Sequence, residues 1–309
     1  MAIVVIRKDN KLDAWKNALI AKAPETPIYS YLEEHPKEEI TMACVWKQPA
    51  DTLKQYHNLK CIASFGAGVD FIFKDQSVPK HIPITRVVDP VLASDMSEFV
   101  LALILSFFKN LNTYKTDQLK NIWSPQEYIR ISDVTVGIMG MGALGEKLAE
   151  DLIKNRFEVI GWANSPKIFP GVEVYAGSNQ KNTFLSRSNI LVCLLPLTKE
   201  TTGILNNKLF EELPKQSYVI NVARGGHLVD EDLLEYVNNG HLAGAALDVF
   251  HQEPLPVEHP FWNHPKIHIT PHVASVSDIE SVIPQLLENY KRLREGLPLM
   301  NEVSREKGY

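Results

Sequence analysis

The stretch that most constrains the fold of this chain is residues 134–155, VTVGIMGMGALGEKLAEDLIKN. An apolar run of strand character meets the glycine-rich turn GMGALG, and a helical pattern with leucines at 144, 148 and 152 follows at once. In such a unit the first glycine permits a tight turn, the second lets the backbone approach a pyrophosphate, and the third lets the helix pack close to the strand. Free N–H groups at the helix start then face the phosphates.

The pattern G-x-G-x-x-G also occurs in ordinary turns. Here the preceding strand and the following helix favour a dinucleotide site over a plain turn. The residues expected to contact the dinucleotide are Gly140, Met141, Gly142, Ala143, Leu144 and Gly145.

The bulk properties of the chain indicate a two-domain protein that binds small molecules. Its 309 residues exceed the usual domain size of about 100–200 residues. The composition, 45% hydrophobic and 22% charged, is typical of a soluble globular protein. The net charge is −5, and no run of Lys or Arg forms a patch for nucleic acid or for a membrane surface.

Cysteines, the N-terminus and the longest apolar run give three further expectations. Cys44, Cys61 and Cys193 lie in apolar segments without metal-binding spacing, so we expect buried free thiols and no metal site. The start MAIVVIRKDN enters a strand directly, without the features of a signal peptide, which favours a cytoplasmic location. The apolar run 99–108 is short of the roughly 20 residues of a membrane span and predicts a buried helix, with Ser94 or Asp95 as its N-cap.

Strand and helix patterns alternate along the chain, which predicts an α/β fold of two doubly wound parallel-sheet domains, Rossmann- or flavodoxin-like, with a cleft between them. The expected division is a substrate-binding domain of residues 1–98 and 285–309 and an NAD(P)-binding domain of residues 99–284. Asp230 is the expected cap of a helix at 231–239, and a final helix is expected at 279–295. The strands expected in the larger domain are 134–139, 157–162, 189–196, 217–223, 243–250 and 266–270.

Two loops of the first domain are candidates for ligand binding, because ligands of open parallel sheets bind beyond the carboxyl ends of the strands. One is VWKQP at 45–49, which contains Trp46, and the other is GAGVD at 66–70. A glycine-rich turn can offer backbone N–H groups to a carboxylate. Core packing for Trp46 and a plain turn for the glycines fit the sequence equally well.

Three polar residues follow separate strands: Arg224 in NVARGG, Glu253 in DVFHQEPLP and His272 in ITPHVAS. Parallel topology brings these strand ends to one crevice beside the glycine-rich turn. A histidine beside a carboxylate is held in one tautomer and can donate a proton near neutral pH, and an arginine can hold a carboxylate and polarise the adjacent carbonyl. Each residue singly also has an ordinary structural explanation. Together they indicate reduction of a carbonyl by hydride.

The turn after the second strand, GWANSPK, favours NADPH over NADH. An NAD site of this fold places an acid there, where it would repel a 2′-phosphate. No acid lies between residues 159 and 171, and Ala163 is followed by Asn164, Ser165 and Lys167, which can bind a phosphate. NADP(H) is therefore the preferred cofactor, with NAD(H) as a second possibility, and an ordinary polar turn is the alternative interpretation.

Along nearly its whole length the chain resembles the D-2-hydroxyacid dehydrogenases. Order and spacing of the motifs match as well as their content. The family motifs are GIMGMGALG (137–145), LLPLTKETTGILN (194–206), NVARGGHLVDEDLL (221–234), LDVFHQEPLP (247–256) and TPHVA (270–274). Those of the narrower subfamily of glyoxylate and hydroxypyruvate reductases are VWKQP (45–49), SFGAGVD (64–70) and SREKGY (304–309).

The resemblance implies roles for single residues: His272 as the acid–base, Glu253 as the residue that orients it, and Arg224 as the residue that binds and polarises a 2-oxo acid. It implies that Trp46 lines the substrate pocket and that Asp248 lies near the nicotinamide. It also implies a homodimer formed largely through residues 93–132. The turn expected to hold the substrate carboxylate comprises Gly66, Ala67, Gly68 and Val69, and the further cofactor contacts are Leu195, Pro196, Val222 and Ala223.

The expected function is the reduction of small 2-oxo acids, such as glyoxylate and hydroxypyruvate, with NADPH. The resembled reductases carry arginine in the turn after the second strand, and this chain does not, so its preference for NADPH is expected to be milder. Two alternatives are an NAD-dependent D-2-hydroxyacid dehydrogenase with another substrate range and a non-catalytic dinucleotide sensor on the same fold. The complete set of Arg224, Glu253 and His272 argues against the sensor.

Overall fold

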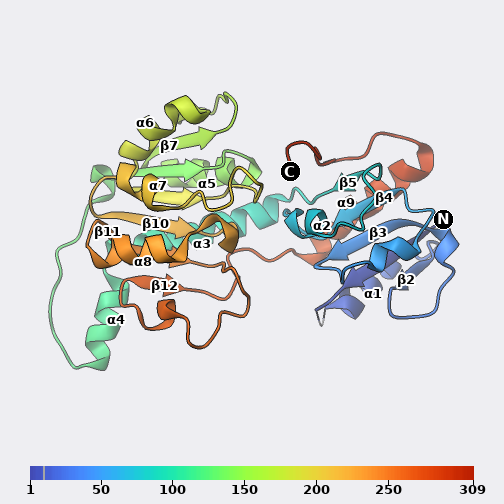
Figure 1. Cartoon of the computed structure of the whole chain (residues 1–309), viewed down its shortest axis with the longest axis horizontal. Coiled ribbons are helices and arrows are strands. Elements are labelled where there is room, and N and C mark those ends of the chain that lie inside the picture. The colour runs from blue at the N-terminus through green and yellow to red at the C-terminus, as the bar shows by residue number, and fades with distance from the viewer. Residues whose placement is uncertain (10) are drawn as a thin grey trace. The chain divides into compact units, whose positions relative to one another are not determined.

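The structure is a computed structural model that describes residues 1–9 and 11–309 (Figure 1). The chain forms two compact units: unit 1 is Met1–Leu92 with Ser277–Tyr309, and unit 2 is Ala93–Val276. The boundaries expected at 98/99 and 284/285 fall inside helices α3 (Pro90–Phe108) and α9 (Ile279–Glu295). Side chains of α9 from Val282 to Tyr290 pack in the core of unit 1, so the chain returns to this unit before the helix begins.

Unit 1 is built on a parallel sheet of five strands in the order β2-β1-β3-β4-β5 (Figure 1). Successive residues of β1 belong alternately to two core clusters, one on each face, as expected for a strand covered on both sides. This strand order is the flavodoxin-like doubly wound arrangement. The elements are β1 (Ala2–Arg7), α1 (Leu12–Lys22), β2 (Ile28–Ser30), η1 (Lys37–Glu39), β3 (Ile40–Trp46), η2 (Thr52–Gln55), β4 (Cys61–Ser64), α2 (Asp70–Lys74), β5 (Ile84–Thr85) and α9.

Unit 2 contains a parallel sheet of seven strands in the order β12-β11-β10-β9-β6-β7-β8. The chain runs outward from β6 in one direction and then returns to β9 on its other side, which is the Rossmann arrangement with its switch point between β6 and β9. The strands are β6 (Thr135–Met139), β7 (Glu158–Ala163), β8 (Glu173–Ala176), β9 (Ile190–Cys193), β10 (Ser217–Asn221), β11 (Leu242–Leu247) and β12 (Ile267–Ile269). The helices are α3, α4 (Leu111–Leu119), η3 (Ile131–Asp133), α5 (Ala143–Lys154), η4 (Ser178–Gln180), α6 (Lys181–Ser186), α7 (Asn207–Glu212), η5 (Gly225–His227), α8 (Asp230–Asn238) and η6 (Pro260–Asn263).

The predicted fold class is confirmed, and two helix starts differ from the prediction. Helix α3 begins at Pro90 rather than after Ser94 or Asp95, because Asp89 accepts a hydrogen bond from Val91 N at 3.1 Å and proline favours the first helical position. Helix α8 has Val229 as its N-cap, and Asp230 is its first residue. The Asp230 carboxylate instead lies 3.3 Å from Nε2 of His259.

Helix α3 is longer than the apolar run from which it was predicted. With 19 residues and a mean hydropathy of 1.8 it is long and apolar enough to cross a membrane, a property that core helices share. Its side chains Val100, Ile104 and Phe108 are buried in the core of unit 2. The three cysteines are free and buried, as predicted.

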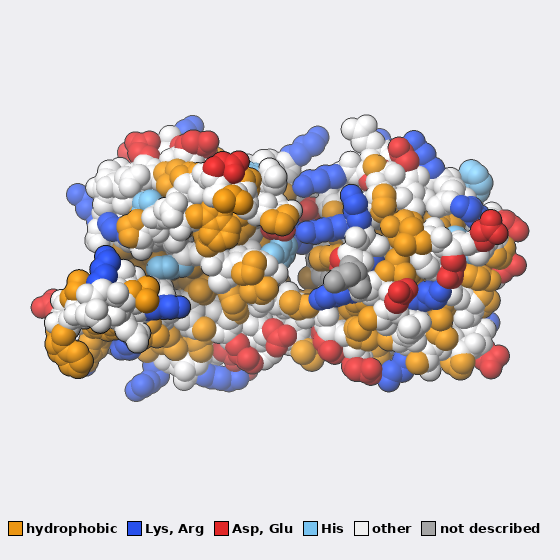
Figure 2. All heavy atoms as spheres, turned by 90° about the horizontal axis from the view of Figure 1, so that it is seen from below, with side chains coloured by type: hydrophobic (Ala, Val, Ile, Leu, Met, Phe, Trp, Pro, Cys, Tyr) orange, Lys and Arg blue, Asp and Glu red, His pale blue; other side chains and the backbone are white. Residues whose placement is uncertain are grey.

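The segment from α4 to residue 131 projects from unit 2 and carries many exposed apolar side chains (Figure 1). Figure 2 shows hydrophobic side chains on the surface of this projection, at the lower left. Trp123 is 95% exposed and Leu119 is 81% exposed. This segment therefore lies on the surface of the chain.

Candidate active site

The glycine-rich turn joins β6 to α5 at the switch point of the sheet in unit 2. Gly140 has a φ of +109°, and a Cβ on it would lie 2.8 Å from the backbone of Leu194. A Cβ on Gly145 would lie 2.1 Å from the carbonyl oxygen of Gly140, so this glycine lets α5 start against the strand. Apart from Gly142 itself and its neighbours along the chain, no atom of residues 1–9 and 11–309 lies within 4 Å of the Cβ position of Gly142, so the turn is open where a pyrophosphate would approach. The turn and the start of α5 fit the phosphates of a dinucleotide.

The turn after β7 carries the residues predicted to select the cofactor. Ala163 is buried at the end of the strand, and Asn164, Ser165 and Lys167 are exposed. Nζ of Lys167 donates to the carbonyl oxygen of Met141 and lies 3.1 Å from Oε1 of Glu146. Glu146 was not predicted as a site residue, because this acid belongs to the first turn of α5 and not to the strand end. Lys167 thus lies beside the glycine-rich turn, with a carboxylate as its present partner.

His272 and Glu253 meet beyond the neighbouring strands β12 and β11. Nδ1 of His272 lies 2.9 Å from Oε1 and 2.8 Å from Oε2 of Glu253. The backbone N–H of Phe250 donates to Oε1 of Glu253 at 3.2 Å and helps to orient the carboxylate. Since Nδ1 faces Glu253, the imidazole can present Nε2 to a ligand. His272 has a φ of +56°, a left-handed conformation that is uncommon for histidine and typical of functional sites.

Asp248 holds the loop that carries His272. Its buried carboxylate accepts hydrogen bonds from Thr270 Oγ1 at 2.6 Å, Val273 N at 3.0 Å and Ala274 N at 2.9 Å. These bonds fasten both ends of the loop around His272 to the end of β11. The geometry therefore gives Asp248 a positioning task in addition to the expected place near the nicotinamide.

Arg224 follows β10, and its loop is built from buried polar side chains. Its backbone N–H donates to Nδ1 of His227 at 3.2 Å, and the carbonyl oxygen of Arg224 accepts from Asn221 Nδ2 at 3.0 Å. His227 is fully buried, and its Nε2 lies 3.3 Å from the carbonyl oxygen of Pro196. Nδ1 also lies 3.0 Å from the carbonyl oxygen of Arg224, so both ring nitrogens of His227 face backbone groups of these loops. His227 was not predicted as a site residue, although it stands three residues after Arg224.

The loops after β9 and β10 begin at the same edge of the sheet as the glycine-rich turn. Leu195 and Pro196 follow β9, directly after the Leu194 backbone that Gly140 approaches. Val222 and Ala223 follow β10 and are buried. These four predicted cofactor contacts lie at the same strand edge as the turn.

The two candidate loops of unit 1 contact each other. β3 and β4 are paired in parallel, so Trp46 and the turn at 66–69 both lie at the carboxyl edge of this sheet. A Cβ on Gly66 would lie 2.6 Å from the Trp46 ring, and Trp46 packs edge-on against Phe71 with 5.4 Å between ring centroids. Ser64 Oγ accepts from Gly66 N at 3.1 Å and donates to Gly68 O at 3.0 Å, which fixes the turn.

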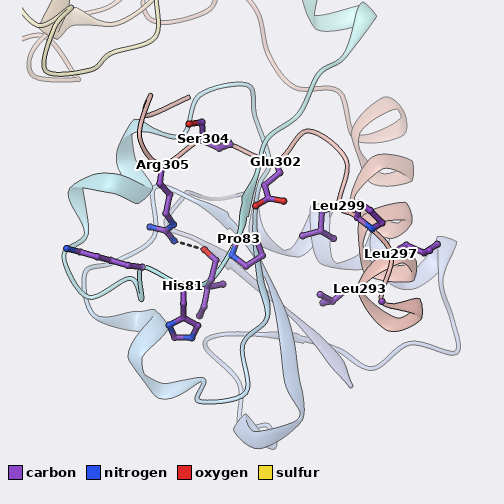
Figure 3. Close-up of a pocket in the computed structure, with 13 residues that line it drawn as sticks. His81, Pro83, Leu293, Leu297, Leu299, Glu302, Ser304 and Arg305 are labelled. Atoms are coloured by element: carbon purple, nitrogen blue, oxygen red, sulfur yellow. Dashed lines mark hydrogen bonds between the residues drawn. The ribbon is translucent and has the colours of Figure 1, made fainter.

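An open cavity of about 620 Å³ lies elsewhere in unit 1, between residues 80–83 and the C-terminal segment (Figure 3). Arg305 closes one side by donating to the carbonyl oxygens of Pro79 at 3.0 Å and Ile82 at 2.6 Å. The cavity lies at the amino end of β5, and the candidate loops lie at the carboxyl ends of β3 and β4. We therefore do not assign the chemistry to it.

A Rossmann sheet whose neighbouring strand ends present an imidazole held by a carboxylate is the architecture of a nicotinamide-dependent oxidoreductase. The chain belongs to the D-isomer specific 2-hydroxyacid dehydrogenase family, whose NAD binding domain matches residues 101–274. This confirms the family resemblance found in the sequence motifs.

Two of the proteins that this chain resembles in sequence are named glyoxylate/hydroxypyruvate reductase A. The chain is 36% identical to glyoxylate/hydroxypyruvate reductase A of Enterobacter sp. (strain 638), over 96% of both chains. It is 41% identical to glyoxylate/hydroxypyruvate reductase A of Klebsiella pneumoniae (strain 342), over 86% of this chain and 87% of that one.

Two solved structures match the whole fold. One is a D-isomer specific 2-hydroxyacid dehydrogenase from Xanthobacter autotrophicus Py2 in complex with NADPH and MES, with a TM-score of 0.95, 34% identity and coverage of 100% of this chain and 99% of that chain. The other is an NADPH-dependent glyoxylate/hydroxypyruvate reductase from Sinorhizobium meliloti in complex with NADP and sulfate, with a TM-score of 0.93, 36% identity and the same coverage.

Proposed function

We propose that this protein is a cytoplasmic reductase that converts small 2-oxo acids, such as glyoxylate and hydroxypyruvate, to 2-hydroxy acids with NADPH. The observation that carries the proposal is the pair of His272 and Glu253, with 2.8 Å between Nδ1 and Oε2, which follows strands of the same parallel sheet as the dinucleotide turn. A dinucleotide sensor would need the turn and not the pair. The named relatives and the NADPH-bound structural neighbour support the same reaction and cofactor.

NADPH, when bound, supplies the hydride that reduces the carbonyl. In the proposed mechanism Nε2 of His272 donates a proton to the carbonyl oxygen as negative charge develops there. Glu253 holds Nδ1 and thereby keeps the imidazole in one orientation, with Nε2 free to face the substrate. Arg224 binds the 2-oxo acid and polarises its carbonyl.

The remaining site residues are proposed to bind cofactor and substrate. Asn164, Ser165 and Lys167 would hold the 2′-phosphate of NADPH after Ala163, and the turn 140–145 would hold the pyrophosphate. The backbone N–H groups of the turn 66–69 would hold the substrate carboxylate. Trp46, which covers Gly66, would limit the substrate to small groups beyond C3.

We also propose a homodimer formed largely through residues 93–132. The exposed apolar side chains of α4 and the following loop support it, since isolated chains rarely leave such a surface uncovered. No nucleic-acid or membrane partner is part of the proposal.

The proposal is tested by following NADPH oxidation over a panel of glyoxylate, hydroxypyruvate, pyruvate and 2-oxoisocaproate, with NADH in parallel. We expect turnover of glyoxylate and hydroxypyruvate, a higher kcat/KM with NADPH than with NADH, and poor turnover of the branched 2-oxoisocaproate. Absence of turnover with every acid would contradict the proposed reaction. Equal efficiency for glyoxylate and 2-oxoisocaproate would contradict the proposed pocket.

A further inference from the structure

Arg86 lies at the carboxyl edge of the sheet in unit 1, next to the turn proposed to hold the substrate carboxylate. It directly follows β5, which pairs in parallel with β4, and β4 pairs with β3 (Figure 1). The N–H of Val87 donates to the carbonyl oxygen of Gly66 at 3.1 Å. The chain at Arg86 is therefore joined to the turn by a backbone hydrogen bond one residue away.

The direction of the Arg86 side chain follows from the register of the strands. Ile62 pairs with Ile84, and both lie in the core cluster on one face, whereas Val87 lies in the cluster on the other face. Side chains alternate along extended backbone, so Arg86 leaves the sheet on the face of Ile84. Ser64, which is on this face as well, bonds to both Gly66 and Gly68. The side chain of Arg86 and the turn therefore share one face and one edge of the sheet.

The guanidinium of Arg86 is partly buried and lacks a hydrogen-bond or ion-pair partner among the described residues. Its backbone N–H donates to Asn301 O at 3.1 Å, but within residues 1–9 and 11–309 no hydrogen bond or ion pair is formed by its side chain. Burial lowers the pKa of Arg86 below its usual value. Arg305, whose pKa burial also lowers, instead donates to two carbonyl oxygens. A desolvated guanidinium with free donors favours an anionic ligand.

Gln48 gives a second, independent observation at the same sheet edge. It lies in the loop after β3, two residues beyond Trp46. Its amide nitrogen and its amide oxygen are both buried, and neither has a hydrogen-bond partner in the part of the chain that the structure describes. Buried polar atoms are nearly always paired, so an orphaned amide indicates a missing polar ligand.

We infer that Arg86 and Gln48 form a polar substrate subsite in unit 1 that, among 2-oxo acids of three carbons, favours those with a hydroxyl group at C3. Arg86 supplies the positive charge for the carboxylate at the turn 66–69, and Gln48 hydrogen-bonds the hydroxyl group at C3. The inference rests on the proposed function and names the substrate class of that site. Hydroxypyruvate fills both positions, whereas pyruvate has the same carbon skeleton and leaves Gln48 unpaired. A site built for a hydroxyl group disfavours the analogue that lacks it.

The charge role is tested with Arg86→Gln and with the matched control Lys60→Gln, which removes an exposed cation at the amino end of β4. A hydrogen bond to a charged group corresponds to about 10–100-fold in affinity, so Arg86→Gln should raise KM for hydroxypyruvate by that factor. We expect unchanged NADPH affinity and a smaller change in kcat. Lys60→Gln should match the wild type. Arg86→Lys, which keeps the charge, should give an intermediate KM and provides the test if Arg86→Gln does not fold.

The hydroxyl role is tested with Gln48→Leu, which should lower the ratio of kcat/KM for hydroxypyruvate over pyruvate by about tenfold. An unchanged ratio would overturn the assignment of Gln48. Unchanged KM in both Arg86 variants would overturn the assignment of Arg86 and leave the proposed reaction intact.

Binding of oxalate to the NADP-bound protein, measured by calorimetry, separates the subsite from the reaction. If the wild type binds oxalate and Arg86→Gln weakens this binding by about 10–100-fold, the anion site is supported, even if no 2-oxo acid is turned over. In that case the proposed reductase function fails and the anion site stands. Equal oxalate affinity of wild type and variant overturns the subsite.

Discussion

At the scale of single residues, the contact of Glu253 with His272 is the part of the site that separates a catalyst from a binding protein. Both carboxylate oxygens lie within 2.9 Å of Nδ1. The carboxylate places a negative charge beside Nδ1, and the geometry leaves Nε2 to the substrate. A neutral side chain of the same shape would still leave Nε2 to the substrate, but it would not place a negative charge beside Nδ1.

We expect Glu253→Gln to lower kcat by about 10–10³-fold, because positioned acid catalysis commonly contributes about 10²–10⁴-fold and the variant keeps part of it. KM and NADPH affinity should change little. Glu258→Gln, an exposed carboxylate of the same loop, is the matched control and should leave kcat unchanged. A kcat of Glu253→Gln equal to that of the wild type would remove this carboxylate from the mechanism.

Lys167 is the residue on which the choice between the two cofactors depends most. Since its ammonium lies 3.1 Å from Glu146, a 2′-phosphate has to compete with a carboxylate for it. Lys167→Ala should weaken NADPH binding by roughly 10–100-fold and barely affect NADH. Glu146→Gln should tighten NADPH binding, because it frees the cation. Fluorescence titration of both cofactors measures these affinities, and Lys154→Ala at the other end of α5 is the control. If Lys167→Ala lost equal affinity for NADPH and NADH, the result would contradict the role of Lys167 in binding the 2′-phosphate.

At the scale of secondary structure elements, the sequence predicted those whose signals are local. Helix α9 has the predicted bounds 279–295, because its apolar face is regular and Asp278 caps it by accepting from Ser281 N at 2.9 Å. Strand β8 of unit 2 was not predicted, since it has only four residues and exists through pairing with a neighbour. Helix α3 starts earlier than predicted because Asp89 and Pro90 cap it, a signal that the apolar run obscured.

In the candidate active site, too, some contacts could be predicted from the sequence and others could not. The rule that ligands bind beyond parallel strand ends predicted the meeting of Glu253 and His272 from sequence positions 19 apart. His227 and Glu146 act through side-chain contacts with Arg224 and Lys167, and no motif spacing encodes these contacts.

His268, in strand β12, makes the stability of the protein depend on pH. Burial lowers the pKa of His268 below its usual value of about 6.5. Between the two pKa values the unfolded chain binds more protons than the folded chain, so stability rises with pH in this window. We expect the thermal midpoint to fall as pH is lowered through about 6.5 and the fall to be smaller in His268→Gln. Differential scanning calorimetry measures the midpoint at each pH, and His57→Gln, which changes an exposed histidine, is the control. If the thermal midpoint of His268→Gln varied with pH as that of the wild type does, His268 would be excluded as the source of the pH dependence.

At the scale of the whole molecule, the projecting segment of unit 2 predicts association. We expect the double variant Leu119→Asp and Trp123→Asp to sediment as a monomer where the wild type sediments as a dimer, because charge on the apolar surface opposes its burial. Ile168→Asp, which changes a fully exposed apolar residue outside the segment, should remain dimeric. Analytical ultracentrifugation distinguishes these states. A monomeric wild type would contradict the proposed homodimer.

The central claim is that this chain reduces 2-oxo acids by proton donation from His272. The most direct test compares single-turnover NADPH oxidation in the presence of glyoxylate for the wild type and His272→Ala, with NADPH affinity measured separately for both. We predict a rate lower by about 10²–10⁴-fold in the variant and nearly unchanged NADPH affinity. An equal rate in the two proteins, at equal NADPH affinity, would contradict the claim.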